Sequence, residues 1–555
     1  MSAKLRVGVL LDSTVLHAWE RVMLDRIESS DYAELAVIIL RKPTAHMGCN
    51  IEPRPQWPTL LYDWAAQLLQ RACRRLERGI CCEHDAFATV EGRNLLARIP
   101  TLGMGATDHD GTVPQDVKRI HALNLDAIVN LTSQAFSAKL STAAKHGVWC
   151  LDSADYPRRG GAPPGFWEVY FGRPVTRMHL TSSGEKGEQH ILACSAAGTH
   201  PLSVKLNRSN AYWNALSLVP RQLAHLHSRG GAALHTAHRS SAVAANRDSE
   251  SLAPDVSALA TYIFRNVKRR ATERLRRTLN IEQWILLFHL GDDLCTSIRE
   301  FQRLVPPIDR YWADPHVLYR DGKFYVFIEE YLLATEKGYI SVIAIDKEGR
   351  AEEPIKVLEQ PYHLSYPFVF EHAGDLYMVP ESMENGTVSL YRCVEFPSKW
   401  EFIKNLLDNI RAVDSTLLHH EGKWWLFANV VENKGGSASE ELFVFYTDCL
   451  LTGTWDAHAL NPVVSDVATA RPAGGIQQKQ GKLYRPAQDC SVRYGYAIKI
   501  KEITALSPDE YAETEVARIA PDWDKNILAT HTLGYAPGLT VVDALLDRRR
   551  FGHHH

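Results

Sequence analysis

The chain has 555 residues, of which 45% are hydrophobic and 23% charged, and its formal net charge is −3 at pH 7. This is the composition of a folded globular protein, and the length favours more than one domain. The small negative charge gives no reason to expect nucleic acid or a membrane surface as partner. The ten cysteines follow no disulfide or zinc spacing, so we expect reduced thiols, no metal and no cofactor.

The two ends of the chain carry no targeting pattern that we recognise. The sequence enters an apolar run at Leu5–Leu11 without a cleavable leader, and no run approaches the roughly 20 apolar residues of a membrane span. The last residues, Gly552–His555, are typical of a purification tag, and we assign 546–555 to a tail. The sequence therefore predicts a cytoplasmic protein without a transmembrane segment.

Residues 1–227 alternate between apolar runs and amphipathic patterns with helical spacing. Such alternation predicts an α/β domain, in which a parallel sheet carries helices on both faces. We expect strands at Leu5–Leu11, Leu35–Leu40, Ala127–Leu131 and Gly147–Leu151, and helices at Val15–Ile27, Pro58–Leu76, Val117–Leu123 and Ala138–His146.

Residues 228–280 separate this domain from the rest of the chain. Ser228–Ser257 is rich in Ser, Ala, Arg and Gly and lacks apolar periodicity, which is typical of a linker. Ala258–Leu279 is a helix with many basic residues. We favour a solvated basic face, with Val267 and Leu275 among the residues packed inward, over a contact with an anionic membrane.

The second half of the chain repeats one cassette four times: an apolar run, a turn with a glycine, then an aromatic run. The turn glycines are Gly322, Gly374, Gly422 and Gly481, at steps of 52, 48 and 59 residues. A period of this size predicts the blades of an all-β propeller, here over residues 281–545. A fifth blade combines Trp284–Phe288 with Leu533–Val542 and closes the ring. The four cassettes are His316–Glu330, Phe368–Ser382, Thr416–Val430 and Gly475–Asp489.

Polar residues recur at fixed offsets from the turn glycines. In a propeller the inner strands of all blades face one axis, so equivalent offsets are expected to meet there. The sequence therefore predicts an acidic pocket at the centre. Eight residues before the glycine lie Asp314, Tyr366 and Asp414, and seven after it lie Glu329, Glu381, Asn429 and Gln488.

A pocket with two or three carboxylates suits the chemistry of a glycosidic bond. One acid protonates the leaving oxygen, and another activates water or attacks the anomeric carbon. Our catalytic candidates are Asp314, Glu381 and Asp414. Aspartate at a strand start is also a common turn former, but recurrence at matched offsets favours the pocket. The candidates for substrate binding are Trp312, Tyr366, Arg471, Arg485, Gln488, Asp489 and His531.

The segments WADPH, YPFVFEHAGDLYMVPES, AVDSTLLHHEGKWWLFAN and RPAQDCS resemble the five-bladed propeller of glycoside hydrolase family 43. They are more similar still to the propeller module of the glucosamine inositolphosphorylceramide transferases. The resemblance covers residues 281–545. It implies that Asp314 is the base, Glu381 the acid and Asp414 an orienting group. The order Asp, Glu, Asp differs from the order Asp, Asp, Glu that is usual in family 43.

The first domain resembles formyltransferases that use 10-formyltetrahydrofolate, on the strand from Gly147 to Ser153 and the following Arg159–Pro163. In that family an Asn–His–Asp set performs the transfer. Cys150, Asp152 and Glu185 stand in those places here, and a carboxylate does not replace a neutral imidazole. We therefore expect a catalytically degenerate site. A nucleophilic Cys150, with His146 or His179 as base, is less favoured than a buried strand cysteine.

Three functions remain open at this point. The first is a carbohydrate-active enzyme whose propeller cleaves or transfers a glycosidic bond, with the first domain assisting. The second is a formyl or acyl transferase that acts on an amino sugar, with 10-formyltetrahydrofolate as cofactor and the propeller as the sugar-recognition module. The third is a scaffold that binds glycans without turnover.

Overall fold

The computed structural model describes residues 3–41, 57–78, 80, 82–104, 114–132, 138–155, 162–184, 189–231, 254–291 and 298–550. They form two compact units. The first comprises Met1–Arg270 with Asn433–Gly436, and the second comprises Ala271–Glu432 with Ser437–His555. Most of the predicted linker, together with Arg159, Gly160, Gly161 and Glu185, lies outside the described residues.

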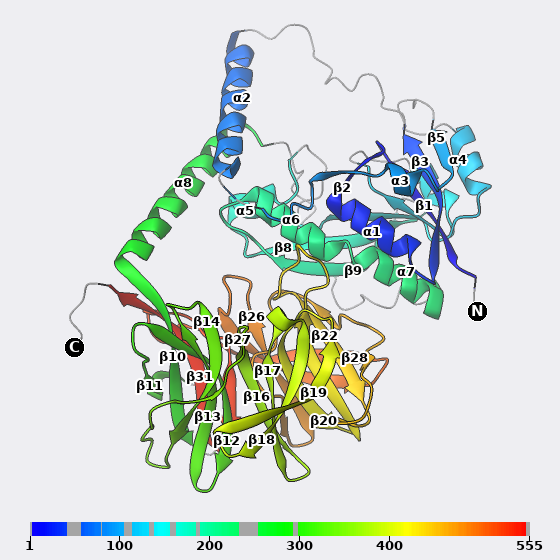
Figure 1. The fold of residues 1–555 in the computed structure, drawn as a ribbon. Helices are drawn as coiled ribbons and strands as arrows, with labels where there is room; N and C mark the ends of the chain where they lie inside the picture. Colours follow the sequence, from blue (N-terminus) through cyan, green and yellow to red (C-terminus); the bar gives the residue numbers. More distant parts are fainter. Residues whose placement is uncertain are drawn as a thin grey trace. The chain divides into compact units, whose positions relative to one another are not determined.

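The first unit contains a seven-stranded sheet with the order β5-β3-β1-β6-β7-β8-β9 (Figure 1). The five strands from β5 to β7 are parallel, as predicted, and β8 and β9 extend the sheet antiparallel. The α/β prediction is confirmed, with a mixed rather than purely parallel sheet. The strands are β1 (Leu5–Leu11), β3 (Ala33–Arg41), β5 (Thr101–Met104), β6 (Ala127–Asn130), β7 (Val148–Ser153), β8 (Val175–Ser183) and β9 (Gln189–Gly198).

Helices cover both faces of this sheet because its central strands are apolar on both sides. Val7 and Val9 of β1 pack toward α1, α6 and α7, whereas Leu10 packs toward α4 and the 3₁₀ helix η1. The helix predicted from Val15 begins at Ala18, since Val15–His17 forms β2 against β4. The elements are α1 (Ala18–Glu28), α2 (Trp57–Arg78), α3 (Arg93–Leu96), α4 (Pro114–His121), η1 (Ala138–Ala143), α5 (Phe166–Phe171), α6 (Val204–Ala215), α7 (Leu218–Arg229), β2 (Val15–His17) and β4 (Thr89–Glu91).

The predicted basic helix is α8 (Val256–Leu279). Its inward residues include Leu259 and Tyr262, which pack against Phe166 of α5. Val267 and Leu275 are 49% and 61% exposed, so our prediction that they pack inward was wrong. They lie on the solvent side of the helix, among its basic residues. No helix in the described ranges is long and apolar enough to cross a membrane.

The second unit is a five-bladed β-propeller, as predicted (Figure 1). Each of the first four blades is one sheet whose strands follow each other along the chain. These blades contain β12 (Arg310–Arg320), β13 (Lys323–Leu332), β14 (Lys337–Ile345), β15 (Ile355–Leu358); β16 (Ser365–His372), β17 (Asp375–Glu381), β18 (Thr387–Glu395), β19 (Lys399–Asp408); β20 (Ala412–His420), β21 (Lys423–Val430), β22 (Glu441–Thr447), β23 (Asp456–Ala457), β24 (Val464–Ser465); and β25 (Gln477–Lys479), β26 (Lys482–Asp489), β27 (Ala497–Leu506), β28 (Tyr511–Ile519).

The fifth blade joins both ends of the propeller sequence. β10 (Asn280–Gly291) pairs antiparallel with β31 (Gly538–Arg549) along its full length. This pairing closes the ring as the sequence predicted, and it places residues 546–549 in a strand rather than in a tail. The blade is completed by β11 (Gln302–Leu304), β29 (Ile527–Ala529) and β30 (Leu533–Ala536).

The four repeated glycines occupy two-residue hairpin turns. Arg320 pairs with Lys323 across the first turn, and both Asp321 and Gly322 have positive φ, at 50° and 83°. The other three turns repeat this pattern. Two successive residues with positive φ define the type I′ turn, whose twist matches that of antiparallel strands and favours glycine at the second position. The cassettes are therefore the inner hairpins of the blades.

Candidate functional site

The inner strands of three blades contain a bulge at the same place. The strand register shifts after Ala313, Ser365 and Val413, and the residue that follows has a left-handed backbone. The φ values are 54° at Asp314, 42° at Tyr366 and 54° at Asp414. Left-handed backbone costs about 1–2 kcal/mol for a residue other than glycine. Strain of this kind, repeated around the ring, re-aims three side chains and marks a functional centre.

Asp314 connects three blades at this centre. The hydroxyl of Thr532 donates to its Oδ1 at 2.8 Å, and the backbone N–H of Tyr366 donates to its Oδ2 at 3.2 Å. Nε2 of His531 lies 3.5 Å from Oδ1. Asp314 is 4% exposed. These contacts therefore fix both carboxylate oxygens in an environment shielded from water.

The carboxylate of Asp543, on β31, binds the backbone at Asp314 and His531. Its Oδ1 accepts the backbone N–H groups of His531 and Thr532 at 2.8 and 3.0 Å, and its Oδ2 accepts that of Asp314 at 3.1 Å. Nδ1 of His531 lies 2.6 Å from the same Oδ2. Burial alone would lower the pKa of His531, but the carboxylates of Asp543 and Asp314 outweigh it and raise that pKa. The imidazole therefore lies between two carboxylates, which favour its protonated form.

Asp314, His531 and Asp543 are also close enough to share a metal ion, since one ligand atom from each lies within 4.8 Å of the others. However, each of the four carboxylate oxygens already accepts a hydrogen bond from an N–H or O–H group. Each of these oxygens keeps a second lone pair, so the hydrogen bonds leave room for a cation as a further partner. The donor set therefore suits a shared cation as well as polar contacts that run from Asp314 through His531 to Asp543.

Asp414 has a cationic partner in the next blade. Arg471 donates to it through Nε at 2.6 Å and Nη2 at 3.3 Å, and the Gln488 amide donates to Oδ2 at 2.9 Å. Burial raises the pKa of Asp414 and Arg471 opposes this rise, whereas Asp314 adds to it. The guanidinium also lies over the ring of Tyr494, at 4.9 Å from its centroid. Arg471 thus links the buried carboxylate to an aromatic side chain that is 47% exposed.

Glu329 and Glu381 complete the carboxylates at the centre. Ser365 and the backbone N–H of Met383 donate to Glu381 at 2.6 and 3.1 Å. Glu329 accepts only the Tyr311 hydroxyl, at 3.3 Å, and lies 3.4 Å from Nε2 of His363. Burial, with Asp314 and Glu381 as further causes, raises the pKa of Glu329 well above its usual range. Burial and the neighbouring carboxylates therefore favour the protonated form of Glu329.

The raised pKa of Glu329 predicts how stability changes with pH. The unfolded carboxyl titrates near pH 4.3, so above that pH the native state binds more protons and stability falls as pH rises. Glu329→Gln removes this proton uptake. We expect the free energy of unfolding of the variant, relative to wild type, to increase steadily between about pH 4 and pH 8. Urea denaturation of both proteins across this range measures the difference in their free energies of unfolding. A difference that does not change with pH would contradict the prediction.

Asn429 occupies the equivalent position in the third blade, opposite Val413 as Glu329 is opposite Ala313. Its side chain is fully buried, and neither its amide nitrogen nor its amide oxygen has a hydrogen-bond partner. Unpaired buried polar groups cost about 1–3 kcal/mol each. An amide that tolerates this cost at the centre of the ring is poised for a ligand or a bound water.

We expect Asn429→Leu to raise the free energy of unfolding by about 1 kcal/mol, because it removes two unpaired polar atoms at similar volume. Gln488→Leu is the matched control. Its amide donates to Asp414 and to the carbonyl of Pro472, both at 2.9 Å, so its removal should destabilise the protein. Chemical denaturation of both variants measures these changes in the free energy of unfolding. Destabilisation by Asn429→Leu would show that the Asn429 amide has hydrogen-bond partners within the fold.

The structure places three of the predicted substrate contacts away from the centre. Trp312 packs in the apolar core beside Phe324 and Val541. Arg485 pairs with Glu513 at 2.8 Å, and Asp489 contacts Lys499 and Arg518. Arg485 and Asp489 lie on the other face of β26 from Gln488, because side chains alternate along a strand.

Tyr366, another predicted contact, is fully buried and committed to the fold. Its hydroxyl bonds with Thr416 and accepts the backbone N–H of Gly474, both at 2.8 Å. It therefore ties its own blade to the next two instead of offering a ring to a sugar. The predicted residues that do meet at the centre are Asp314, Glu381, Asp414, Arg471, Gln488 and His531, which we call the central cluster together with Glu329 and Asp543.

The degenerate site of the first unit lies at the carboxyl end of β7. Cys150 is partly buried and accepts the amide N–H of Asn130 at 3.6 Å. Asp152 lies two residues further and pairs in register with His179 of β8. Glu185 lies outside the described residues, and the resemblance of this unit to formyltransferases stays a prediction. None of the seven cysteines in the described ranges forms a disulfide.

Fold and geometry together define a five-bladed propeller whose centre holds five buried carboxylates, a histidine and an arginine. Residues 296–532 match the family model described as glucosamine inositolphosphorylceramide transferase 1, N-terminal. The match lies within the propeller. The transferase of this name from Arabidopsis thaliana is 37% identical over 209 residues, which are 37% of this chain and 27% of that protein. The one from Oryza sativa subsp. japonica is 36% identical over 207 residues, 37% of this chain and 28% of that protein.

The chain thus spans about a quarter of the length of these curated relatives. Among solved structures, a family 117 glycoside hydrolase from Zobellia galactanivorans covers 50% of this chain and 96% of its own, with 13% identity and a TM-score of 0.32. A thermostable family-43 glycoside hydrolase covers 45% of this chain and 92% of its own, with 14% identity and a TM-score of 0.33.

Proposed function

We propose that this protein is a carbohydrate-active enzyme, and that the central cluster of its propeller cleaves or transfers a glycosidic bond. The observation that carries the proposal is the pairing of unlike carboxyl groups at one centre. Burial and neighbouring carboxylates raise the pKa of Glu329, whereas Asp314 accepts the Thr532 hydroxyl and the Tyr366 N–H and lies 3.5 Å from Nε2 of His531. A carboxyl group with a raised pKa near a second carboxyl group in a different environment is the arrangement that acid–base cleavage of a glycoside needs.

In this proposal Glu329 is the general acid and donates its proton to the leaving glycosidic oxygen. Asp314 is the base or nucleophile on the other side of the anomeric carbon, and His531 lies beside it. Glu381, the acid expected from the family 43 resemblance, already accepts a hydroxyl and a backbone N–H. We therefore assign Glu381 a binding role, as an acceptor for sugar hydroxyls.

The names of the relatives favour sugar transfer within this proposal. They are transferases whose printed names combine glucosamine with inositolphosphorylceramide. The half-exposed ring of Tyr494, which also contacts His531, offers a stacking surface for a sugar next to the cluster. We propose a sugar conjugate as the substrate and a binding role for Arg471 through its contact with that ring.

Comparing Glu329→Gln with Glu330→Gln tests this function. Both residues are buried on β13, but Glu330 faces the other side, where Arg310 and Ser341 bind it at 2.8 and 2.7 Å. We expect Glu329→Gln to lower turnover of aryl glycosides or sugar nucleotides by about 10²–10⁴-fold. Glu330→Gln should lower it little per folded molecule. Equal turnover of both variants, or no turnover by wild type across such a panel, would count against the proposal.

A further inference from the structure

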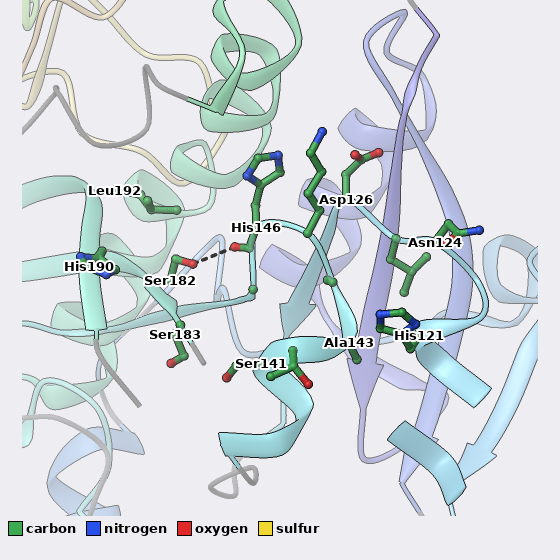
Figure 2. A pocket seen from close by; sticks show the side chains of 16 residues that line it. His121, Asn124, Asp126, Ser141, Ala143, His146, Ser182, Ser183, His190 and Leu192 are labelled. Atoms are coloured by element: carbon green, nitrogen blue, oxygen red, sulfur yellow. Dashed lines mark hydrogen bonds between the residues drawn. The ribbon is translucent and has the colours of Figure 1, made fainter. Parts of the chain in front are cut away.

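A concave site lies in the first unit, at the end of the sheet opposite to Cys150 and Asp152. Its volume is about 590 Å³, and Figure 2 shows it from close by. Its walls come from the end of η1, the turn before β7, and the ends of β8 and β9 that flank that turn. Because these are the amino ends of the parallel strands, this pocket is separate from the degenerate site.

The walls of this pocket are rich in groups that bind anions. Three imidazoles and one ammonium group line it, from His121, Lys145, His146 and His190. Figure 2 shows the three histidines around one hollow, with Asp126 on its far wall. Among the described lining residues, Asp126 is the one with a carboxylate. Its Oδ2 already accepts the backbone N–H of Arg6 at 2.8 Å. The lining therefore favours an anion over a cation.

A buried hydroxyl provides the independent sign that a ligand belongs here. Ser141 lines the pocket and is 3% exposed, yet its Oγ has no hydrogen-bond partner among the residues that the structure describes. A buried hydroxyl without a partner costs about 1–3 kcal/mol, which a ligand atom would recover. Ser183 lies beside it on the same wall (Figure 2), and Ser182 donates to the carbonyl of His146 at 2.8 Å and keeps its lone pairs.

We propose that this pocket binds the phosphate ester of a small polyol, of which a sugar phosphate is the simplest case. Lys145 supplies charge for the phosphate, and the imidazoles and the Ser141 hydroxyl supply hydrogen-bond donors. The volume exceeds that of phosphate alone and falls in the range of pockets for small molecules, about 300–1,000 Å³. Asn124 and Asp126, on the opposite wall, offer acceptors for the hydroxyl groups of the polyol.

Calorimetry on the full chain with glucose 6-phosphate, inorganic phosphate and glucose tests this proposal. We expect the two phosphates to bind and to compete with each other, and glucose not to bind. Lys145→Ala should weaken binding of glucose 6-phosphate by about tenfold or more, since it removes a charged hydrogen bond. Lys139→Ala is the matched control, because Lys139 is an exposed lysine on η1 outside the lining.

Ser141→Ala separates ligand binding from folding. It deletes a hydroxyl without a partner, so the melting temperature should stay the same or rise while affinity for glucose 6-phosphate falls about fivefold. Three results would overturn the proposal: no binding of either phosphate, equal binding of glucose and glucose 6-phosphate, or equal affinities of Lys145→Ala and Lys139→Ala. The test does not involve the propeller, so it stands apart from the proposed glycosidic activity.

Discussion

Asp314→Asn is expected to lower kcat/KM for the glycosidic substrate by about 10⁴-fold, at the upper end of acid–base contributions. The fold should survive this change. Asparagine tolerates left-handed backbone, as the φ of 54° requires, and its Oδ1 still accepts the Thr532 hydroxyl. The amide nitrogen would face the N–H of Tyr366, so we expect a modest loss of stability of about 1 kcal/mol. Steady-state kinetics and urea denaturation on one preparation measure both effects.

Asp489→Asn is the matched control for this experiment. Asp489 is also buried in the propeller, but it faces Lys499 and Arg518 on the other side of β26. The same substitution there should leave turnover per folded molecule unchanged. If Asp314→Asn kept full turnover, its role as base would have to be abandoned. Sugar binding without turnover, unchanged in Asp314→Asn, would instead favour a scaffold that binds glycans.

The blades were predictable because the signals that define them are local. A turn of two residues with positive φ needs glycine, and the strands on either side alternate apolar and polar residues. The same offsets then brought Asp314, Asp414 and Glu381 together, since equivalent positions in different blades face one axis. The closing strand pair of β10 with β31 followed from the apolar pattern and the need to remove free strand edges.

Other parts of the site depend on contacts that no local pattern shows. Asp543 lies in the fifth blade, which lacks the cassette, and its only signal is a carboxylate between apolar neighbours, in the run VVDALL. Strand alternation places Gln488 at the centre and thereby excludes Arg485 and Asp489, a rule that could have removed both from the prediction. Trp312 lies two residues before Asp314, next to the bulge of β12. A bulge interrupts the regular alternation of side chains between the two faces of a strand.

Arg471→Met is expected to lower the free energy of unfolding by about 3–5 kcal/mol, because it leaves Asp414 buried without its counter-charge. Asp414 is 1% exposed, and no water can replace the guanidinium without opening the ring. Arg350→Met is the matched control. Arg350 also donates through Nε to an aspartate, Asp346, at 2.6 Å, but its side chain is 77% exposed. Loss of an exposed pair should cost about 1 kcal/mol or less.

A double variant shows whether the cost comes from the stranded charge. Asp414→Asn in the Arg471→Met background removes the carboxylate, and the amide can still accept the N–H of Gln488. We therefore expect it to recover a large part of the lost stability, since an uncharged pair carries a smaller desolvation penalty. Urea denaturation of the wild type, both single variants and the double variant closes the cycle. If Arg471→Met lowered the free energy of unfolding no more than Arg350→Met does, the buried pair would not stabilise the propeller. The role of Arg471 would then be to bind a ligand beside Tyr494.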